Sequence, residues 1–140
     1  MSRKNLMLLA LSVSLVTGVV LSGGCAASTT QIIENITPQA ANILIQENQN
    51  NPDFVILDVR TPEEFADGHI ENAINIDSYE DTFKDELNNL DKDKTYLIYC
   101  QSGNRSGQSL SIMAELNFSN ISNILGGIVR WGSEGLPTVK

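Results

Sequence analysis

Residues 96–107 read Tyr-Leu-Ile-Tyr-Cys-Gln-Ser-Gly-Asn-Arg-Ser-Gly, an apolar run that stops at Cys100 and gives way to a polar, glycine-containing segment. The run does not alternate between apolar and polar residues, which is typical of a strand covered on both faces. A helical pattern begins near Ser106, where Leu110 and Met113 belong to one apolar stripe. The stretch therefore predicts a buried strand, a short loop and an amphipathic helix.

A second continuous apolar run, at residues 54–57, has the same character, and shorter strand and helix patterns alternate along the rest of the chain. Such alternation is typical of a layered α/β domain with a mainly parallel sheet. With 140 residues the chain is long enough for one such domain and too short for two ordinary ones. Further strands are expected at residues 31–34, 73–76 and 121–125, and helices at residues 38–47, 62–66, 81–90 and 106–118.

The helix expected at residues 62–66 has three start signals. Thr61 can cap it, Pro62 suits its first position, and Glu64 completes a capping box. We interpret the acidic side chains around this helix as a solvated face. These side chains are Glu63, Glu64, Asp67 and Glu71.

The chain is strongly acidic, with 17 acidic and nine basic residues and a formal net charge of −8. Such a surface repels phosphate groups and anionic lipids, so electrostatics make neither nucleic acid nor an anionic membrane surface an expected partner. The two cysteines, Cys25 and Cys100, lie in different settings and do not predict a disulfide. One histidine, His69, leaves no metal-binding pattern, so neither a metal nor another cofactor is expected.

Residues 1–24 have the form of an export signal. Arg3 and Lys4 give a basic start, residues 6–21 are apolar, and small residues follow. An uncleaved transmembrane helix is the alternative, although the apolar run is shorter than the roughly 20 residues that span a bilayer. We therefore expect an exported protein.

The end of this segment, Leu-Ser-Gly-Gly-Cys, resembles a prokaryotic lipobox. Cys25 is then expected to be lipidated and to anchor the protein to the cell envelope, on its periplasmic or extracellular face. Leu21 stands four places before Cys25 rather than the usual three, so ordinary cleavage that leaves Cys25 free stays open. Residues 25–31 would carry the lipid and form a flexible tether, and residues 32–140 would form the domain.

Cys100 is expected where parallel sheets bind ligands, between the carboxyl end of a strand and the N-terminus of a helix. Backbone N–H groups there, together with Arg105, would stabilise the thiolate, which is the nucleophilic form of the side chain. Gly103 suits the positive φ that turns loop amides inward. The alternative is a small buried hydrophobe at a strand end; we favour a reactive sulfur that solvent can reach.

Three stretches of the sequence together resemble the rhodanese family. Residues 57–76 contain Asp-Val-Arg, Glu-Phe, Gly-His-Ile and Ala-Ile-Asn-Ile, and residues 100–106 are similar to the family's Cys-x-x-Gly-x-Arg-Ser active loop. Residues 126–137 supply the third motif, whose Trp131 is expected in the core or at the rim of the site. The resemblance covers nearly all of residues 32–140 and implies one α/β domain with a central, mostly parallel sheet flanked by helices.

The same resemblance implies roles for individual residues. Cys100 would carry the sulfur, Arg105 would close the active loop, and Asp58 would pin Arg105 by a hydrogen bond. Arg60 is a supporting residue, and His69 is expected to make a scaffold hydrogen bond. The loop backbone would hold the transferred sulfur through Gln101, Ser102, Gly103, Asn104 and Ser106.

The activity implied is that of a sulfurtransferase that works by double displacement. Cys100 would take sulfane sulfur from thiosulfate, a persulfide or a polysulfide and pass it to a thiol, a sulfur-carrier protein or cyanide. Thiosulfate-preferring relatives often carry extra basic residues in the loop, whereas Gln101, Ser102 and Asn104 are neutral, which puts thiosulfate in doubt. We expect a monomer whose partners are small sulfur compounds or a sulfur-carrier protein.

Two other functions stay open. Phosphatases and arsenate reductases of the same fold have five residues between cysteine and arginine, whereas four separate Cys100 from Arg105. The shorter loop suits a single sulfur rather than a tetrahedral oxyanion. Rhodanese-like binding modules dock a partner without catalysis, but they commonly lack the cysteine that is present here.

Overall fold

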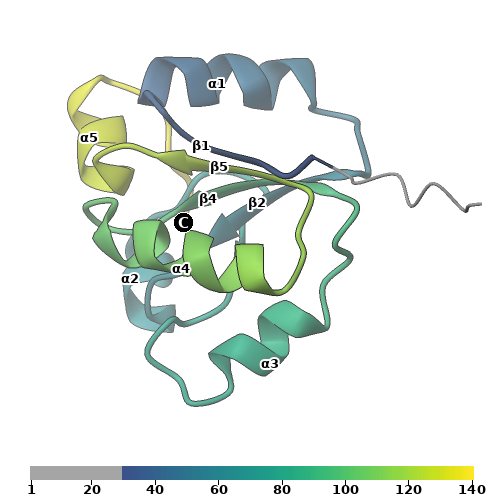
Figure 1. Cartoon of the computed structure of the whole chain (residues 1–140). Helices are drawn as coiled ribbons and strands as arrows, with labels where there is room; N and C mark the ends of the chain where they lie inside the picture. The colour runs from purple at the N-terminus through teal and green to yellow at the C-terminus, as the bar shows by residue number, and fades with distance from the viewer. Residues whose placement is uncertain (1–29) are drawn as a thin grey trace, which may run out of the picture.

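The computed structural model describes residues 30–140 (Figure 1). The expected export signal and the lipidation of Cys25 lie outside the described residues, as does most of the expected tether. Within residues 30–140, the structure contains no helix of the length and apolarity that crossing a membrane requires.

Five parallel strands form one sheet in the order β1-β5-β4-β2-β3. The predicted parallel α/β sheet is therefore confirmed. The edge strand expected at residues 73–76 has only two residues, and the other bounds differ slightly from those expected. The strands are β1 (Ile32–Ile36), β2 (Phe54–Asp58), β3 (Ile74–Asn75), β4 (Thr95–Tyr99) and β5 (Asn120–Ile124).

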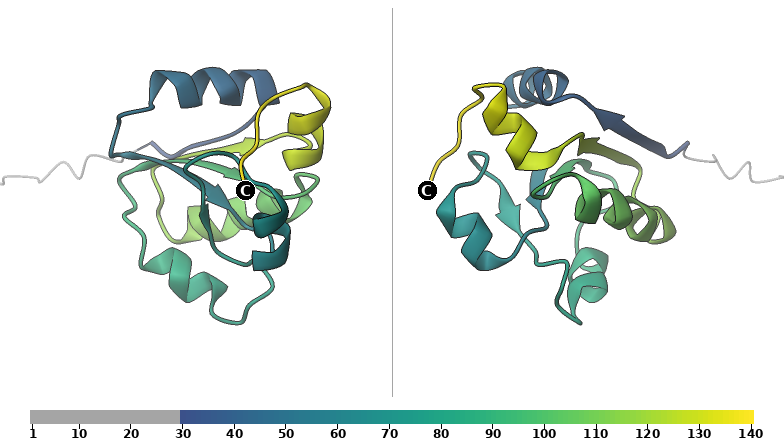
Figure 2. Two further views of the ribbon diagram at one scale, coloured as in Figure 1. Left: turned by 180° about the vertical axis from the view of Figure 1, so that it is seen from behind. Right: turned by 90° about the vertical axis from the view of Figure 1, so that its left-hand side faces the viewer.

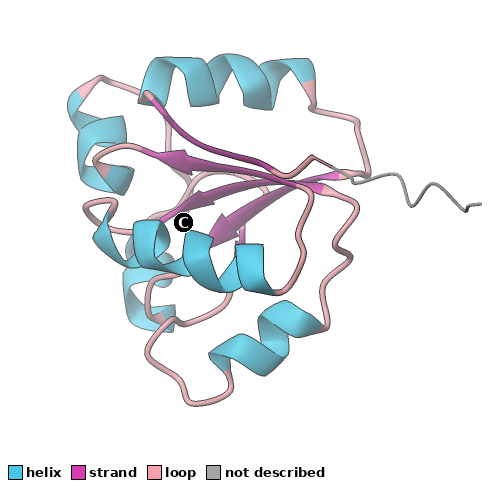
Figure 3. Ribbon diagram, viewed as in Figure 1, coloured by secondary structure: helices cyan, strands magenta, loops and turns pink. Residues whose placement is uncertain are grey.

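Helices cover both faces of the sheet (Figures 1 and 3). The first and last helices lie on one face, the third and fourth lie on the other, and the short second helix lies near one edge, as the two further views show (Figure 2). These helices are α1 (Pro38–Glu47), α2 (Pro62–Asp67), α3 (Phe83–Asn88), α4 (Asn104–Glu115) and α5 (Gly127–Ser133).

The central strand β4 explains why its apolar run does not alternate. Tyr96 and Ile98 pack in a core cluster with residues of α3 and α4, whereas Leu97 and Tyr99 pack with residues of α1 and α5. All four side chains are at most 1% exposed. Because each fully buried large apolar side chain stabilises the fold by about 1.5–3 kcal/mol, this strand favours large apolar or aromatic residues at these four positions.

The carboxyl ends of β2 and β4 lie side by side. Asp58 is in register with Tyr99, and the N–H of Val59 donates to the carbonyl oxygen of Tyr99 at 3.0 Å. The chain turns from the loop after β4 directly into α4 because Gly103 takes a φ of +89°. Helix α4 therefore begins at Asn104, two residues before the predicted start.

Candidate active site

Cys100 follows β4 directly and precedes the N-terminus of α4, as the sequence predicts. The residue is 0% exposed, so the expectation that solvent reaches its sulfur is not met in this structure. Gln101 and Ser102, which follow it, are exposed. A sulfur donor can therefore contact the thiol only after residues around Cys100 move.

Hydrogen bonds from the loop converge on the sulfur of Cys100. The N–H of Gly103 lies 3.1 Å from Sγ, and the hydroxyl of Ser106 donates to Sγ at 3.4 Å. Burial raises the pKa of the thiol, but hydrogen bonds from Ser106, then from the backbone of Ser102 and Gly103, outweigh burial. The pKa of Cys100 consequently lies below its ordinary value, which favours the thiolate.

The predicted cradle of backbone amides is thus present in part. Ser102, Gly103 and Ser106 contribute to the hydrogen bonding of Sγ. Among the described residues, no hydrogen bond joins Gln101 or Asn104 to the sulfur. The exposed polar side chains of Gln101 and Asn104 lie at the surface of the loop.

Replacing Ser106 by alanine should raise the pKa of Cys100, because the variant loses the hydroxyl that bonds Sγ. The pH dependence of alkylation by iodoacetamide measures this change, and its midpoint should move to higher pH. Ser111→Ala is the matched control, since Ser111 is an exposed serine of the same helix. An unchanged midpoint in Ser106→Ala would show that the hydroxyl does not stabilise the thiolate.

The N-terminus of α5 supports the loop from behind. The N–H groups of Ile128 and Val129 donate to the carbonyl oxygens of Cys100 and Gln101 at 2.9 and 3.1 Å. Gly127 makes this approach possible: it has a φ of +57°, and a Cβ atom there would lie 2.6 Å from the carbonyl oxygen of Gln101. The backbone of the cysteine loop, residues 100–103, is therefore fixed by residues that lie 28 positions further along the chain.

Arg105 does not pair with Asp58, so that prediction is wrong. Both Nη atoms of Arg105 bond the carboxylate of Glu64, at 2.8 and 2.7 Å, and the guanidinium lies 5.1 Å from the centre of the Tyr79 ring. The interpretation of Glu64 as part of a solvated face is also wrong. The capping box of α2 is confirmed, and it holds the carboxylate of Glu64 towards α4, where it meets Arg105.

The ion pair with Arg105 should give Glu64 a pH-dependent role in stability. Hydrogen bonds from Arg105 lower the pKa of Glu64 from 4.5 to about 2. The stabilisation by its ionised form is complete above pH 4.5 and is lost as the pH falls towards about 2. Urea denaturation at several pH values should show that the stability difference between the wild type and Glu64→Gln shrinks over this interval.

Glu63→Gln is the matched control for this series. Glu63 is an exposed carboxylate next to Glu64 in the same helix. Its replacement should leave the shape of the wild-type pH profile unchanged. A constant difference between the wild type and Glu64→Gln from pH 4.5 down to about 2 would contradict the role assigned to the ion pair.

Asp58 instead pairs with Arg60, and both residues are buried. Both Nε and Nη2 of Arg60 bond the carboxylate of Asp58, and Nη2 also donates to the carbonyl oxygen of Gly68 at 2.7 Å. Burial lowers the pKa of Arg60, but the hydrogen bonds to Asp58 and the negative charge of Asp58 outweigh burial, so this pKa is raised. Nη1 points to Gln101, 3.4 Å from its Oε1. Arg60 thereby connects α2 and the cysteine loop, as expected of a supporting residue.

His69 and Trp131 have the structural roles predicted for them. Nδ1 of His69 lies 3.0 Å from the carbonyl oxygen of Phe65, and the two rings stack. Trp131 is 1% exposed and donates from Nε1 to the carbonyl oxygen of Pro137 at 2.9 Å. Both side chains are therefore parts of the scaffold.

Residues 42–134 match the family model of the rhodanese-like domain. The chain belongs to the rhodanese-like domain family. A rhodanese-related protein from Thermoplasma volcanium has 32% sequence identity and a TM-score of 0.63 over 76% of this chain and 97% of that protein. The predicted family and the predicted fold are confirmed.

Curated relatives of this rhodanese-like domain include a sulfurtransferase from Allochromatium vinosum, 32% identical over 69% of this chain and 88% of that protein. Thiosulfate sulfurtransferase 16 from Arabidopsis thaliana is 28% identical over 75% of this chain and 96% of that protein. A tRNA uridine(34) hydroxylase from Photorhabdus laumondii is 35% identical over 66% of this chain, which spans only 29% of the hydroxylase. The prediction of a rhodanese-type sulfurtransferase is confirmed at the level of the family.

Beside the loop of this rhodanese-like domain lies a pocket of about 370 Å3. Arg60 and Gln101 contribute polar groups to its lining, and Ile128 and Val129 of α5 contribute apolar groups. Cys100 itself does not line the pocket, which borders the loop at the next residue, Gln101. The pocket therefore offers space for a molecule next to the thiol.

Proposed function

We propose that this domain transfers sulfane sulfur through a persulfide on Cys100. The observation that carries the proposal is the set of loop hydrogen bonds that converge on Sγ and lower the pKa of the thiol. Such a loop stabilises an anionic sulfur, whether it belongs to the thiolate or to the terminal atom of a persulfide. The Allochromatium relative named as a sulfurtransferase supports the same reading.

The first step is attack of the Cys100 thiolate on the terminal sulfur of the donor. A bond forms between Sγ and that sulfur, the donor's sulfur–sulfur bond breaks, and its electron pair stays on the leaving group. The leaving group is sulfite when the donor is thiosulfate, and a thiolate or a shortened polysulfide otherwise. The enzyme then carries one additional sulfur atom with a negative charge.

The second step returns the enzyme to its starting state. An acceptor thiolate or cyanide attacks the outer sulfur, its bond to Sγ breaks, and Cys100 leaves as the thiolate. The product is a persulfide of the acceptor, or thiocyanate when the acceptor is cyanide. The acceptor is oxidised as it takes the sulfur, and the donor is reduced as it loses it. The two changes balance, so the reaction needs no further oxidant, reductant or cofactor.

We propose as the donor a persulfide or an organic polysulfide, whose sulfur end carries a single negative charge, rather than thiosulfate. The loop side chains are neutral, and the positive charge of Arg105 is paired with Glu64. A dianion such as thiosulfate would therefore meet no unpaired positive group in the loop, on a chain whose net charge is −8. The same ion pair argues against a phosphatase, because both Nη atoms of Arg105 are bonded to Glu64 rather than available to an oxyanion on Cys100.

Intact mass measurement after incubation with each donor tests this proposal. Polysulfide and a small-molecule persulfide should each add about 32 Da, the mass of one sulfur atom, and thiosulfate should do so more slowly. Subsequent addition of cyanide or a thiol should remove the added mass. If no donor adds sulfur to folded protein, the domain is not a sulfurtransferase; if thiosulfate loads fastest, only the choice of donor is wrong.

We also propose that Cys25 anchors the domain to the cell envelope through a lipid. The support is the signal-like sequence of residues 1–24 and the lipobox-like segment before Cys25. Expression of the full chain in a bacterial host should place it in the membrane fraction, and Cys25→Ala should release it. Equal membrane association of both proteins would exclude the lipid anchor.

A further inference from the structure

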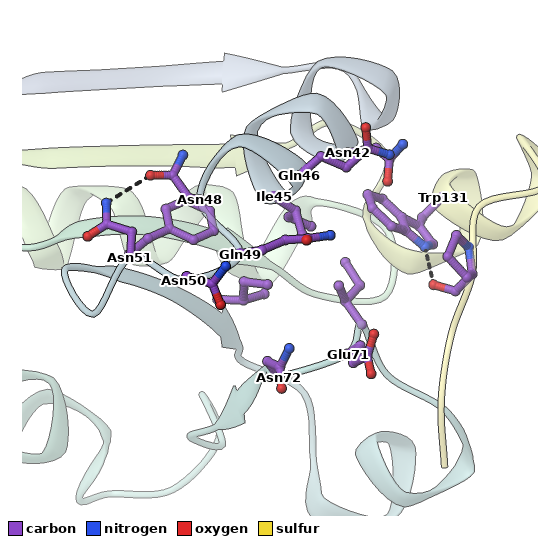
Figure 4. A pocket seen from close by; sticks show the side chains of 14 residues that line it. Asn42, Ile45, Gln46, Asn48, Gln49, Asn50, Asn51, Glu71, Asn72 and Trp131 are labelled. Atoms are coloured by element: carbon purple, nitrogen blue, oxygen red, sulfur yellow. Dashed lines mark hydrogen bonds between the residues drawn. The ribbon is translucent and has the colours of Figure 1, made fainter.

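A second cleft lies on the sheet face that α1 and α5 cover (Figure 4). Its volume of about 570 Å3 falls within the range of small-molecule sites, roughly 300–1,000 Å3. It shares no lining residue with the pocket beside the cysteine loop. The cleft is therefore a separate site from the pocket beside Cys100.

The floor of this cleft is apolar. Ile56 of β2, Ile70 and Trp131 line it and are buried, whereas Phe54 is only half-buried. The indole N–H of Trp131 is satisfied by the carbonyl oxygen of Pro137, the bond dashed in Figure 4. The floor thus offers apolar ring surface without an unpaired polar group.

Carboxamide side chains surround this floor, and Gln49 lies near the middle of the view in Figure 4. Two of them are held in place, because Nδ2 of Asn51 donates to Oδ1 of Asn48 at 2.9 Å. The other five make no side-chain hydrogen bond to another described residue. Each can donate and accept hydrogen bonds at the same time. These five are Asn42, Gln46, Gln49, Asn50 and Asn72.

The electrostatics of the cleft disfavour an anion. Glu71 is the one charged residue among the described residues that line it. The last turn of α1 contains no basic residue, and a helix C-terminus carries a partial negative charge. The chain is also strongly acidic as a whole. A ligand that fits these surroundings has no net negative charge and many hydrogen-bonding groups.

We propose that the cleft binds a neutral carbohydrate. Hydroxyl groups both donate and accept hydrogen bonds, so they match the five free carboxamides, and the C–H face of a sugar ring can pack on Phe54. A peptide that adds to the sheet fits less well, because the neighbouring edge strand, β3 (Ile74–Asn75), offers only two residues for pairing.

Nuclear magnetic resonance of the side-chain amide groups in the full chain tests the proposal. The probes are maltotriose, cellotriose and triacetylchitotriose. At least one should shift amide signals of the cleft, with a Kd on the order of 1 mM. Trigalacturonate, an anion of similar size, should not. The proposal is overturned if none of the three neutral sugars shifts these signals, or if a blocked trialanine peptide does so in their place.

A triple variant, Gln46→Ala, Gln49→Ala and Asn50→Ala, should weaken sugar binding at least about tenfold. All three side chains are exposed, so folding should not depend on them. The matched control removes exposed carboxamides outside the cleft, with Gln39→Ala and Gln108→Ala. The control should bind like the wild type. Equal affinity of the triple variant and the wild type would show that the carboxamides do not form a site.

Discussion

Replacement of Cys100 by serine should abolish the gain of about 32 Da that a polysulfide gives to the wild-type protein. A serine hydroxyl in the same loop stays protonated at neutral pH, so no nucleophile attacks the donor. Sulfur transfer to cyanide should fall by at least about 10³-fold, as it does when other enzymes lose their nucleophile. Intact mass and thiocyanate formation measure the two effects.

Two controls make this result specific. Cys25→Ala removes the other cysteine of the chain and should leave the added mass unchanged. Urea denaturation should show that Cys100→Ser is still folded. Serine is only slightly smaller than cysteine, and its hydroxyl oxygen can accept the hydrogen bond from the N–H of Gly103. Retention of the added mass in folded Cys100→Ser would place the sulfur elsewhere and remove the basis of the proposed mechanism.

The fold could be predicted because its signals are local and agree with one another. The apolar runs of β2 and β4 lack alternation since both faces of the sheet are covered. Thr61, Pro62 and Glu64 start α2 where the sequence places it. The position of Cys100 followed from the same logic, because a strand that ends before a helix in a parallel sheet puts its last residues at the ligand-binding edge.

The partner of Arg105 could not be predicted in the same way. Asp58 and Glu64 both lie near the end of β2, so spacing along the chain does not distinguish them. The difference is explained by Arg60. Arg60 lies close to Asp58 and donates hydrogen bonds to both carboxylate oxygens of Asp58, and Arg105 pairs with Glu64 instead. The capping box was the available signal, because it fixes the Glu64 carboxylate at the start of α2 rather than in solvent.

The burial of Cys100, which packs with Val59 and Met113 in a core cluster, was also missed. The contact that supports its loop was missed as well, because it comes from far away in the sequence. The first turn of α5 packs against the cysteine loop and bonds the carbonyl oxygens of Cys100 and Gln101. No pattern within residues 96–107 predicts that contact. The only sequence signal for this contact is the pair Gly126 and Gly127, since a close approach of two backbones requires a residue without a Cβ atom.

Gly127→Ala should therefore distort the backbone of the cysteine loop, although residue 127 has no direct role at the sulfur in the proposed mechanism. The new Cβ would meet the carbonyl oxygens of Cys100 and Gln101, which are backbone atoms and cannot move aside separately. Alanine at a φ of +57° adds conformational strain. We expect the free energy of unfolding to fall by about 2–4 kcal/mol and the rate of sulfur loading to fall with it.

Gly132→Ala is the control for stability. Gly132 lies in α5 as well, but a Cβ there would have no atom within 4 Å. Because alanine is the better helix former, this variant should match or exceed the wild type in stability, by up to about 1 kcal/mol. Urea denaturation measures both variants, and iodoacetamide reports whether the thiol of Gly127→Ala has lost its depressed pKa. If Gly127→Ala matched the wild type in both measurements, α5 would not be what holds the loop amides around the sulfur.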